Sequence, residues 1–124
     1  METINIKGKN YVMVHERIKE FRKLYPNGSI LTEMLSNNDG VCVFKAMIYL
    51  GGKEGCVAVG HAYEKESSSF INKTSYIENA ETSAIGRALG VLGIGIDTSL
   101  ASADEVANAV KNQSKGDSIL WLRN

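Results

Sequence analysis

The first regular pattern along the chain is an apolar stripe with helical spacing. Val14, Ile18, Phe21 and Tyr25 recur every three or four residues, and the positions between them are mostly charged. The spacing predicts an amphipathic helix over residues 13–25. A proline and an Asn-Gly pair follow Tyr25 directly, and both favour a turn, so the helix is expected to end there.

A stretch rich in strand-forming side chains comes next and is interrupted twice. The first interruption, residues 37–40, reads Asn-Asn-Asp-Gly and contains the residue types that tight hairpin turns need. The second interruption, residues 51–55, is rich in glycine. The pattern predicts a three-stranded antiparallel meander, with strands over residues 29–36, 41–50 and 56–65.

Successive side chains of a strand point to opposite faces, so the second and third strands each have two faces. One face is apolar or small and is expected to pack against helices, with Cys42 and Cys56 as free thiols on it. The other face is expected to meet solvent. It carries Val41, Val43, Lys45, Met47, Tyr49, Val57, Val59, His61, Tyr63 and Lys65.

A long helix is predicted to begin at Ser75, because Ser75 and Glu78 have the spacing of a capping box ahead of an apolar run. Glycine inside a helix costs about 0.5–1 kcal/mol relative to alanine, so several glycines there require a compensating close contact. We expect that contact to be with the sheet or with a neighbouring subunit. The glycines concerned are Gly86, Gly90 and Gly93.

A second capping box, Ser102 to Glu105, predicts a short helix that ends near Gln113. The elements together predict an α+β fold: a helix, a three-stranded antiparallel β-meander and a long helix, which form a β-β-β-α core, and then a short C-terminal helix. We expect residues 1–113 to form one domain and residues 114–124 a C-terminal tail.

Composition narrows the functional classes. Hydrophobic residues make up 44% of the chain and charged residues 23%, as in ordinary globular proteins. The 14 basic residues cancel the 14 acidic ones, so any basic site must be local. With no long apolar run and no secretion signal at the start, we expect a cytoplasmic protein that does not contact membranes.

The sequence gives little support for a catalytic site or a metal site. His61 and Glu64 point to opposite faces of their strand and cannot form an acid–base pair. The glycines of residues 51–55 join two antiparallel strands and do not open a helix, so they do not form a phosphate-binding loop. Two cysteines and two histidines lack the spacing of metal ligands. We therefore predict neither an enzyme nor a cofactor or metal.

Binding residues are easier to find. Arg87 is the lone basic residue of a helix rich in alanine and glycine, and an isolated guanidinium is costly to bury. It either pairs with Glu78 or Glu81 or contacts an anionic ligand. The segment 65–73 combines cations, hydroxyls and Phe70, which are ingredients of a loop that contacts single-stranded nucleic acid or, equally, of an ordinary linker.

The run from Glu81 to Gly90, followed by Leu92-Gly93-Ile94-Gly95, resembles the signature helix of single-strand DNA-annealing proteins. These are the phage recombinases of the Erf and Sak type and their Rad-fifty-two relatives. The resemblance covers roughly residues 10–113. It implies ATP-independent annealing by rings or filaments of subunits, with single-stranded DNA in a basic groove between the meander and the helix.

On this resemblance, Arg87 matches the basic position before Ala-Leu and is expected to contact the DNA backbone. Its predecessor is Gly86, where the eukaryotic relatives have a second basic residue. The expected function is therefore a phage or prophage protein that binds single-stranded DNA and anneals it in recombination and repair, as a homo-oligomer packed through the helix glycines. The alternatives are an oligomeric phage protein that sequesters a protein or small molecule, and a metal-dependent nuclease. The expected DNA-binding residues are Lys45, His61, Tyr63, Lys65, Phe70, Lys73 and Arg87.

Overall fold

The structure is a computed structural model and describes residues 1–111. The predicted tail, residues 114–124, and the last two residues of the predicted short helix lie outside the described residues. A helical segment at residues 103–111 ends the described part. Before it, the elements are β1 (Thr3–Ile6), β2 (Lys9–Val12), α1 (Val14–Leu24), β3 (Ser29–Asn38), β4 (Val41–Tyr49), β5 (Ala58–Lys65), the 3-10 helix η1 (Glu66–Ser68) and α2 (Asn72–Leu92).

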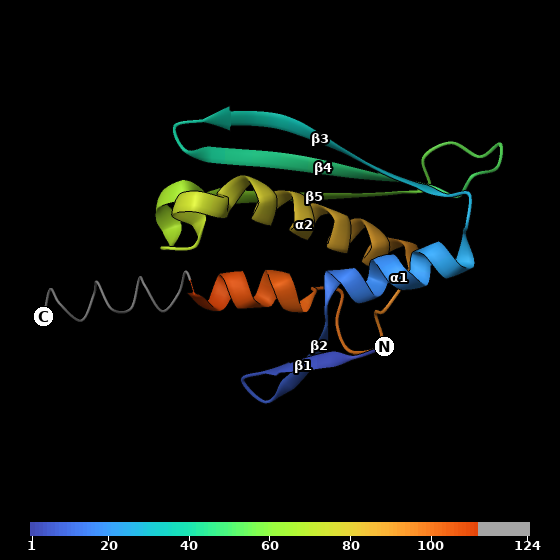
Figure 1. The fold of residues 1–124 in the computed structure, drawn as a ribbon, viewed down its shortest axis with the longest axis horizontal. Coiled ribbons are helices and arrows are strands. Elements are labelled where there is room, and N and C mark those ends of the chain that lie inside the picture. Colours follow the sequence, from blue (N-terminus) through green and yellow to red (C-terminus); the bar gives the residue numbers. More distant parts are fainter. Residues whose placement is uncertain (112–124) are drawn as a thin grey trace, which may run out of the picture.

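The elements are stacked in layers (Figure 1). The sheet of β3, β4 and β5 forms the first layer, and α2 runs along one of its faces. Helix α1 and the segment 103–111 lie under α2, and the β1–β2 hairpin lies beyond them. Within residues 1–111, no helix or strand covers the other face of the sheet.

The α+β class is confirmed, but the predicted order of elements is not matched. The chain begins with a two-stranded hairpin, β1–β2, ahead of the first helix, and η1 stands between the sheet and α2. The hairpin turns through Lys7 and Gly8, both with positive φ (50° and 87°). Its strands have four residues each and are mostly exposed, so the hydrophobic pattern gave no signal for them.

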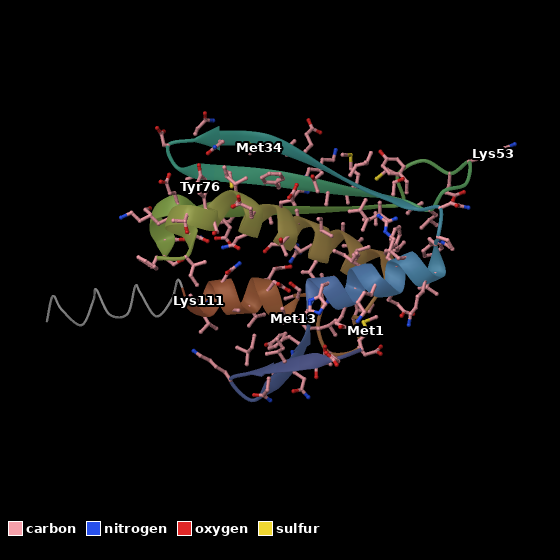
Figure 2. The ribbon with its side chains drawn as sticks, viewed as in Figure 1. Met1, Met13, Met34, Lys53, Tyr76 and Lys111 are labelled. Carbon is pink, nitrogen blue, oxygen red and sulfur yellow. The ribbon has the colours of Figure 1, made fainter. Side chains whose placement is uncertain are left out.

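The three-stranded sheet is antiparallel, with β4 in the centre. Asn38 pairs with Val41 around Asp39 and Gly40, whose φ values of 53° and 72° are those of a tight hairpin turn. The Asn-Asn-Asp-Gly segment therefore forms the turn that its residue types favour. The loop between β4 and β5 is longer, and Figure 2 shows Lys53 at its tip, pointing away from the molecule.

The core lies between the sheet and α2. Phe21 of α1, Phe44 and Ile48 of β4 and Leu89 of α2 are at most 5% exposed. At Gly60 of β5, a Cβ atom would lie only 2.4 Å from the backbone nitrogen of Ala88, so β5 and α2 approach each other at backbone distance. The prediction that small residues on β5 leave room for a helix is confirmed.

Two local predictions are wrong. Helix α2 begins at Asn72 and not at Ser75, which has non-helical dihedral angles (φ −136°, ψ 19°) and marks a kink. Hydrogen bonds of the Asn72 side chain to Glu64 and Ser68 fix this earlier start. Cys42 is buried as expected, but Cys56 is exposed because β5 begins only at Ala58.

The second capping box is present in part, since the Glu105 backbone nitrogen donates to Ser102 Oγ at 3.2 Å. The neighbouring Asp104 has a longer-range role: its Oδ2 accepts a hydrogen bond from the backbone nitrogen of Val14 at 2.8 Å. Helix α1 has no cap from its own N-cap residue, Met13. The segment 103–111 therefore caps the first turn of α1. Within residues 1–111, no helix is long and apolar enough to cross a membrane.

Candidate functional site

The face of the sheet turned away from α2 carries most of the predicted binding residues. We call it the outer face. Alternation places apolar, aromatic and basic side chains on it together, and Tyr63 is 64% exposed. The outer face consists of Leu31, Glu33, Val43, Lys45, Met47, Tyr49, Val59, His61, Tyr63 and Lys65.

Strand register brings cations and rings of the outer face next to each other. Lys45 on β4 is the cross-strand partner of His61 on β5, and Val43 is the partner of Tyr63. Directly opposite residues in an antiparallel pair have Cβ atoms roughly 4.5–5.5 Å apart, so the two pairs form one contiguous surface. Glu33 pairs with Lys45 from the other side and offsets part of its charge.

Phe70 and Lys73 lie elsewhere. Phe70 is 87% exposed, and both residues line a cavity of about 1150 Å³ beside the β3–β4 turn and Lys111. Figure 2 shows Lys111 at the end of the last described helical segment. The structure therefore does not bring these two residues to the outer face.

The hydroxyls of this loop have partners within the chain. Ser68 Oγ donates to the carbonyl of Lys65 at 2.8 Å and accepts from the amide of Asn72, also at 2.8 Å. Ser69 Oγ accepts from the Asn72 backbone nitrogen at 3.1 Å, and Glu64 Oε2 accepts from the Asn72 amide at 2.6 Å. These two hydroxyls fix the start of α2, so they do not form the open phosphate-binding set expected of the loop.

Arg87 has a partner that the sequence did not suggest. Its Nη1 lies 3.4 Å from Glu105 Oε2, and the two side chains are 39% and 20% exposed. Arg87 thus pairs with Glu105 and not with Glu78 or Glu81, which was one of the two alternatives, and Glu81 accepts a hydrogen bond from Thr32 Oγ1 at 2.7 Å. Burial raises the pKa of Glu105, and the charge of Arg87 opposes that rise.

A pocket of about 540 Å³ opens where β5, one of the two edge strands of the sheet, meets α2 and the segment 103–111. We call it the edge pocket. Three of its lining residues belong to the outer face, and Arg87 and Glu105 lie on its opposite side, on helices. The edge pocket is lined by His61, Ala62, Tyr63, Glu64, Lys65, Ser68, Ser83, Arg87, Glu105 and Ala109.

Two polar atoms of the edge pocket lack partners within the part of the chain that the structure describes. Ser83 is 3% exposed, and its Oγ makes no hydrogen bond there. The same holds for Oε1 of Glu105, whereas its Oε2 contacts Arg87. Buried polar atoms normally have partners, so these two are the most unusual atoms of the site.

The helix glycines meet parts of their own chain. A Cβ on Gly86 would lie 2.7 Å from Val14 Cγ2, and one on Gly90 would lie 2.8 Å from Arg17 Nη1. Gly93 has φ 111° and ends α2 as its C-cap. Contacts with α1 and the helix ending thus explain all three glycines without a neighbouring subunit, and their predicted role in oligomer packing stays untested.

Arg17 is one of the charged residues between the apolar positions of α1, and it was not expected to be buried. It is fully buried, and burial lowers its pKa. Its guanidinium donates to four backbone carbonyls outside α1. These belong to Gly86 (2.7 Å), Leu100 (3.0 Å), Ser99 (3.0 Å) and Gly95 (3.1 Å).

A signal for this burial exists in the sequence. Arg17 stands three residues after Val14 and four before Phe21, which places it on the apolar stripe itself. Its environment belongs to the fold, so Arg17 is a structural cation and is not available for an external ligand.

Comparison with known proteins changes the family assignment. The family model described as "Slr1353 N-terminal dsRNA-binding domain-like" matches residues 18–92. No curated protein and no solved structure matches the chain significantly.

The expected membership of the Erf and Sak annealing proteins is therefore wrong. The matched segment contains the run from Glu81 to Gly90 on which that resemblance mainly rested. The alanines and glycines of that run are explained by the close packing of α2 against β5 and α1, and small residues are what such close packing requires. The match covers more than half of the chain, and the chain belongs to the Slr1353 N-terminal dsRNA-binding domain-like family.

Proposed function

We propose that this chain is a nucleic-acid-binding domain, that the outer face is its binding surface, and that it prefers a single strand to a duplex. The observation that carries the proposal is the pairing of Lys45 with His61 beside Val43 and Tyr63 on a sheet face that no described element covers. Cations next to exposed rings match the two parts of an unpaired nucleotide, phosphate and base.

The side chains have separate roles in this proposal. Tyr63 and His61 stack on bases, and Lys45 and Lys65 neutralise phosphates as the strand crosses β4 and β5. Stacking on an aromatic side chain contributes about 1–3 kcal/mol per base and tolerates every sequence. The apolar residues between the rings and the cations keep water away from the stacked bases.

The choice of a single strand follows from what the outer face offers. A duplex hides the faces of its bases, so its recognition depends on phosphates and 2′-hydroxyls spread over about 16 base pairs. The outer face has two lysines, and Glu33 offsets one of them. Such a surface supports stacking better than it supports a long row of phosphate contacts.

Duplex RNA is the second candidate, because the description of the family refers to double-stranded RNA. A direct comparison separates the two. Fluorescence anisotropy is measured with a labelled single-stranded oligonucleotide and with an RNA duplex of about 16 base pairs. Tighter binding of the single strand supports the outer-face proposal, whereas tighter binding of the duplex favours the second candidate.

The outer face itself is tested with variants. Tyr63→Ala is expected to weaken single-strand binding by about 1–3 kcal/mol. Lys45→Ala is expected to weaken binding and to make the log–log salt slope shallower by about 0.7, the contribution of one phosphate on a single strand. Lys23→Ala, on the exposed side of α1, is the control. Equal effects of Lys23→Ala and Lys45→Ala argue against the outer face.

Two further expectations stay predictions, and one alternative stays open. Annealing is tested by mixing two complementary oligonucleotides with the protein in the absence of ATP. Homo-oligomer formation is tested by the mass in solution with and without an oligonucleotide. If neither single strands nor duplexes bind, the alternative of an interaction protein for a protein or small molecule becomes the better interpretation.

A further inference from the structure

The edge pocket has the size and position to receive part of a strand bound to the outer face. Its volume of about 540 Å³ is within the range of roughly 300–1000 Å³ that is typical of small-molecule pockets. His61, Tyr63 and Lys65 line it and also belong to the outer face. A strand that crosses β5 therefore reaches the pocket without leaving the surface proposed above.

The polar atoms of the pocket specify what it can hold. Ser83 Oγ and Glu105 Oε1 are buried and make no hydrogen bond to any residue of the range 1–111. Ser83, Glu105 and Arg87 all line the edge pocket, and the Arg87 guanidinium contacts the other carboxylate oxygen of Glu105. An ionised carboxylate only accepts hydrogen bonds, while a hydroxyl either donates or accepts. A fitting ligand thus has an N–H donor next to a group that pairs with a hydroxyl.

Nucleobases differ in this respect. Cytosine has an amino group next to a ring nitrogen that accepts, and adenine has the same pair of groups. Uracil and thymine have a carbonyl oxygen in place of the amino group, and that oxygen faces the carboxylate without a hydrogen atom between them. Tyr63 and Arg87 supply a ring and a planar guanidinium, both of which stack on bases.

We propose that the edge pocket holds one nucleobase with an exocyclic amino group, read by Glu105 and Ser83 while neighbouring nucleotides lie on the outer face. The inference rests on the proposed function and adds base selectivity to it. Glu105 accepts from the amino group, Ser83 pairs with the adjacent ring nitrogen, and Lys65 at the rim contacts the phosphate. Arg87 holds the carboxylate in place through Oε2.

The test uses two labelled oligonucleotides of deoxythymidine that differ in one central nucleotide, deoxycytidine in one and deoxyuridine in the other. Fluorescence anisotropy gives the affinity of the full chain for each. A base-specific pair of hydrogen bonds predicts roughly tenfold tighter binding of the deoxycytidine oligonucleotide. Ser83→Ala and Glu105→Gln are expected to remove the preference. Glu105→Gln is also expected to tighten binding of the deoxyuridine oligonucleotide, because the amide can donate to the uracil carbonyl and the variant removes a negative charge beside a polyanion.

Thr82→Ala is the matched control, because it removes a hydroxyl from the next residue of the same helix, and Thr82 lines a different cavity. It is expected to keep the tenfold preference. Ser83→Ala also has an independent readout. Removing a buried hydroxyl without a partner is expected to raise the thermal unfolding temperature while selectivity is lost, so a loss of selectivity cannot be attributed to unfolding.

The outcomes separate the two proposals. If the wild-type chain binds both oligonucleotides equally while Lys45→Ala weakens both, base reading in the pocket is wrong and the outer face stands. A preference that persists in both Ser83→Ala and Glu105→Gln also overturns the pocket. If no single strand binds at all, the pocket inference and the single-strand function both fail.

Discussion

Substitution of Arg17 is predicted to cause a larger loss of stability than the other substitutions considered below. Its fully buried guanidinium holds the carbonyls of Gly86, Gly95, Ser99 and Leu100, so one side chain of α1 fastens both α2 and the segment after it. Arg17→Met keeps most of the aliphatic stem and removes every donor. The expected result is a large loss of stability without any change at the outer face.

The size of this stability loss is the difference between the hydrogen bonds that the guanidinium makes and the cost of burying it. A hydrogen bond to a charged group contributes about 1.5–3 kcal/mol, so four of them sum to about 6–12 kcal/mol. Burying the guanidinium costs several kcal/mol, which leaves a net loss of about 3–5 kcal/mol. That is a large part of the about 5–15 kcal/mol that stabilises a typical domain. Arg17→Lys is expected to lose stability as well, because a single ammonium cannot reach four carbonyls. The loss is expected to be somewhat smaller than in Arg17→Met, because the ammonium keeps some of the donors.

Urea unfolding followed by circular dichroism measures the free energy of unfolding directly. In a domain of this size, each 1 kcal/mol corresponds to about 4 °C in Tm, so the expected loss of about 3–5 kcal/mol in Arg17→Met lowers Tm by roughly 12–20 °C. Lys23→Met on the exposed side of the same helix is the control and is expected to change stability by less than about 0.5 kcal/mol. An Arg17→Met chain as stable as the wild type refutes this reasoning, since it means that the carbonyls do not need the guanidinium.

Three further predictions concern packing, capping and pH. Gly60→Ala is expected to lower the free energy of unfolding by about 1–3 kcal/mol or more, because the new Cβ meets the backbone of Ala88, which cannot move aside. An unchanged midpoint of urea unfolding contradicts this. Asp104→Ala is expected to cost about 1 kcal/mol through loss of the cap on Val14, whereas Asp104→Asn is expected to retain most of it. The raised pKa of Glu105 means that its burial favours the protonated form, so its contribution to stability is present at low pH and is lost as pH rises through the folded-state pKa. Glu105→Gln is therefore expected to gain in Tm relative to the wild type between acidic and neutral pH, and a difference that does not change with pH contradicts the assignment.

Local patterns in the sequence predicted the elements that depend on neighbouring residues. The stripe from Val14 to Tyr25 gave α1 to within one residue at each end, and the Asp39-Gly40 turn followed from the residue types that tolerate positive φ. The outer-face residues of β4 and β5 were also identified, because alternation along a strand is a local property, whereas those of β3 were not assigned.

Contacts between distant parts of the chain were not predictable in this way. Arg87 has two acidic residues within about three turns of its own helix, and yet its partner is Glu105, on a different helix. The four carbonyls that Arg17 binds lie 69 to 83 residues away from it. The sequence pattern contains no information on which backbone carbonyls remain free after the helices pack.

The family resemblance shows a related difficulty. An alanine- and glycine-rich helix indicates that something approaches closely, but it does not indicate what. In this fold β5 and α1 make that approach, and the same residue types suggested a subunit interface when only the sequence was considered.

The capping of α1 by Asp104 bears on how the domain can be excised and on how it emerges during synthesis. A fragment limited to the matched residues 18–92 lacks both that carboxylate and the turn of α1 that it caps. A nascent chain that has not yet reached residue 104 leaves the first backbone amide of α1 without that cap. Useful boundaries for expression therefore extend at both ends beyond the matched segment, from the start of α1 to the helix at residues 103–111.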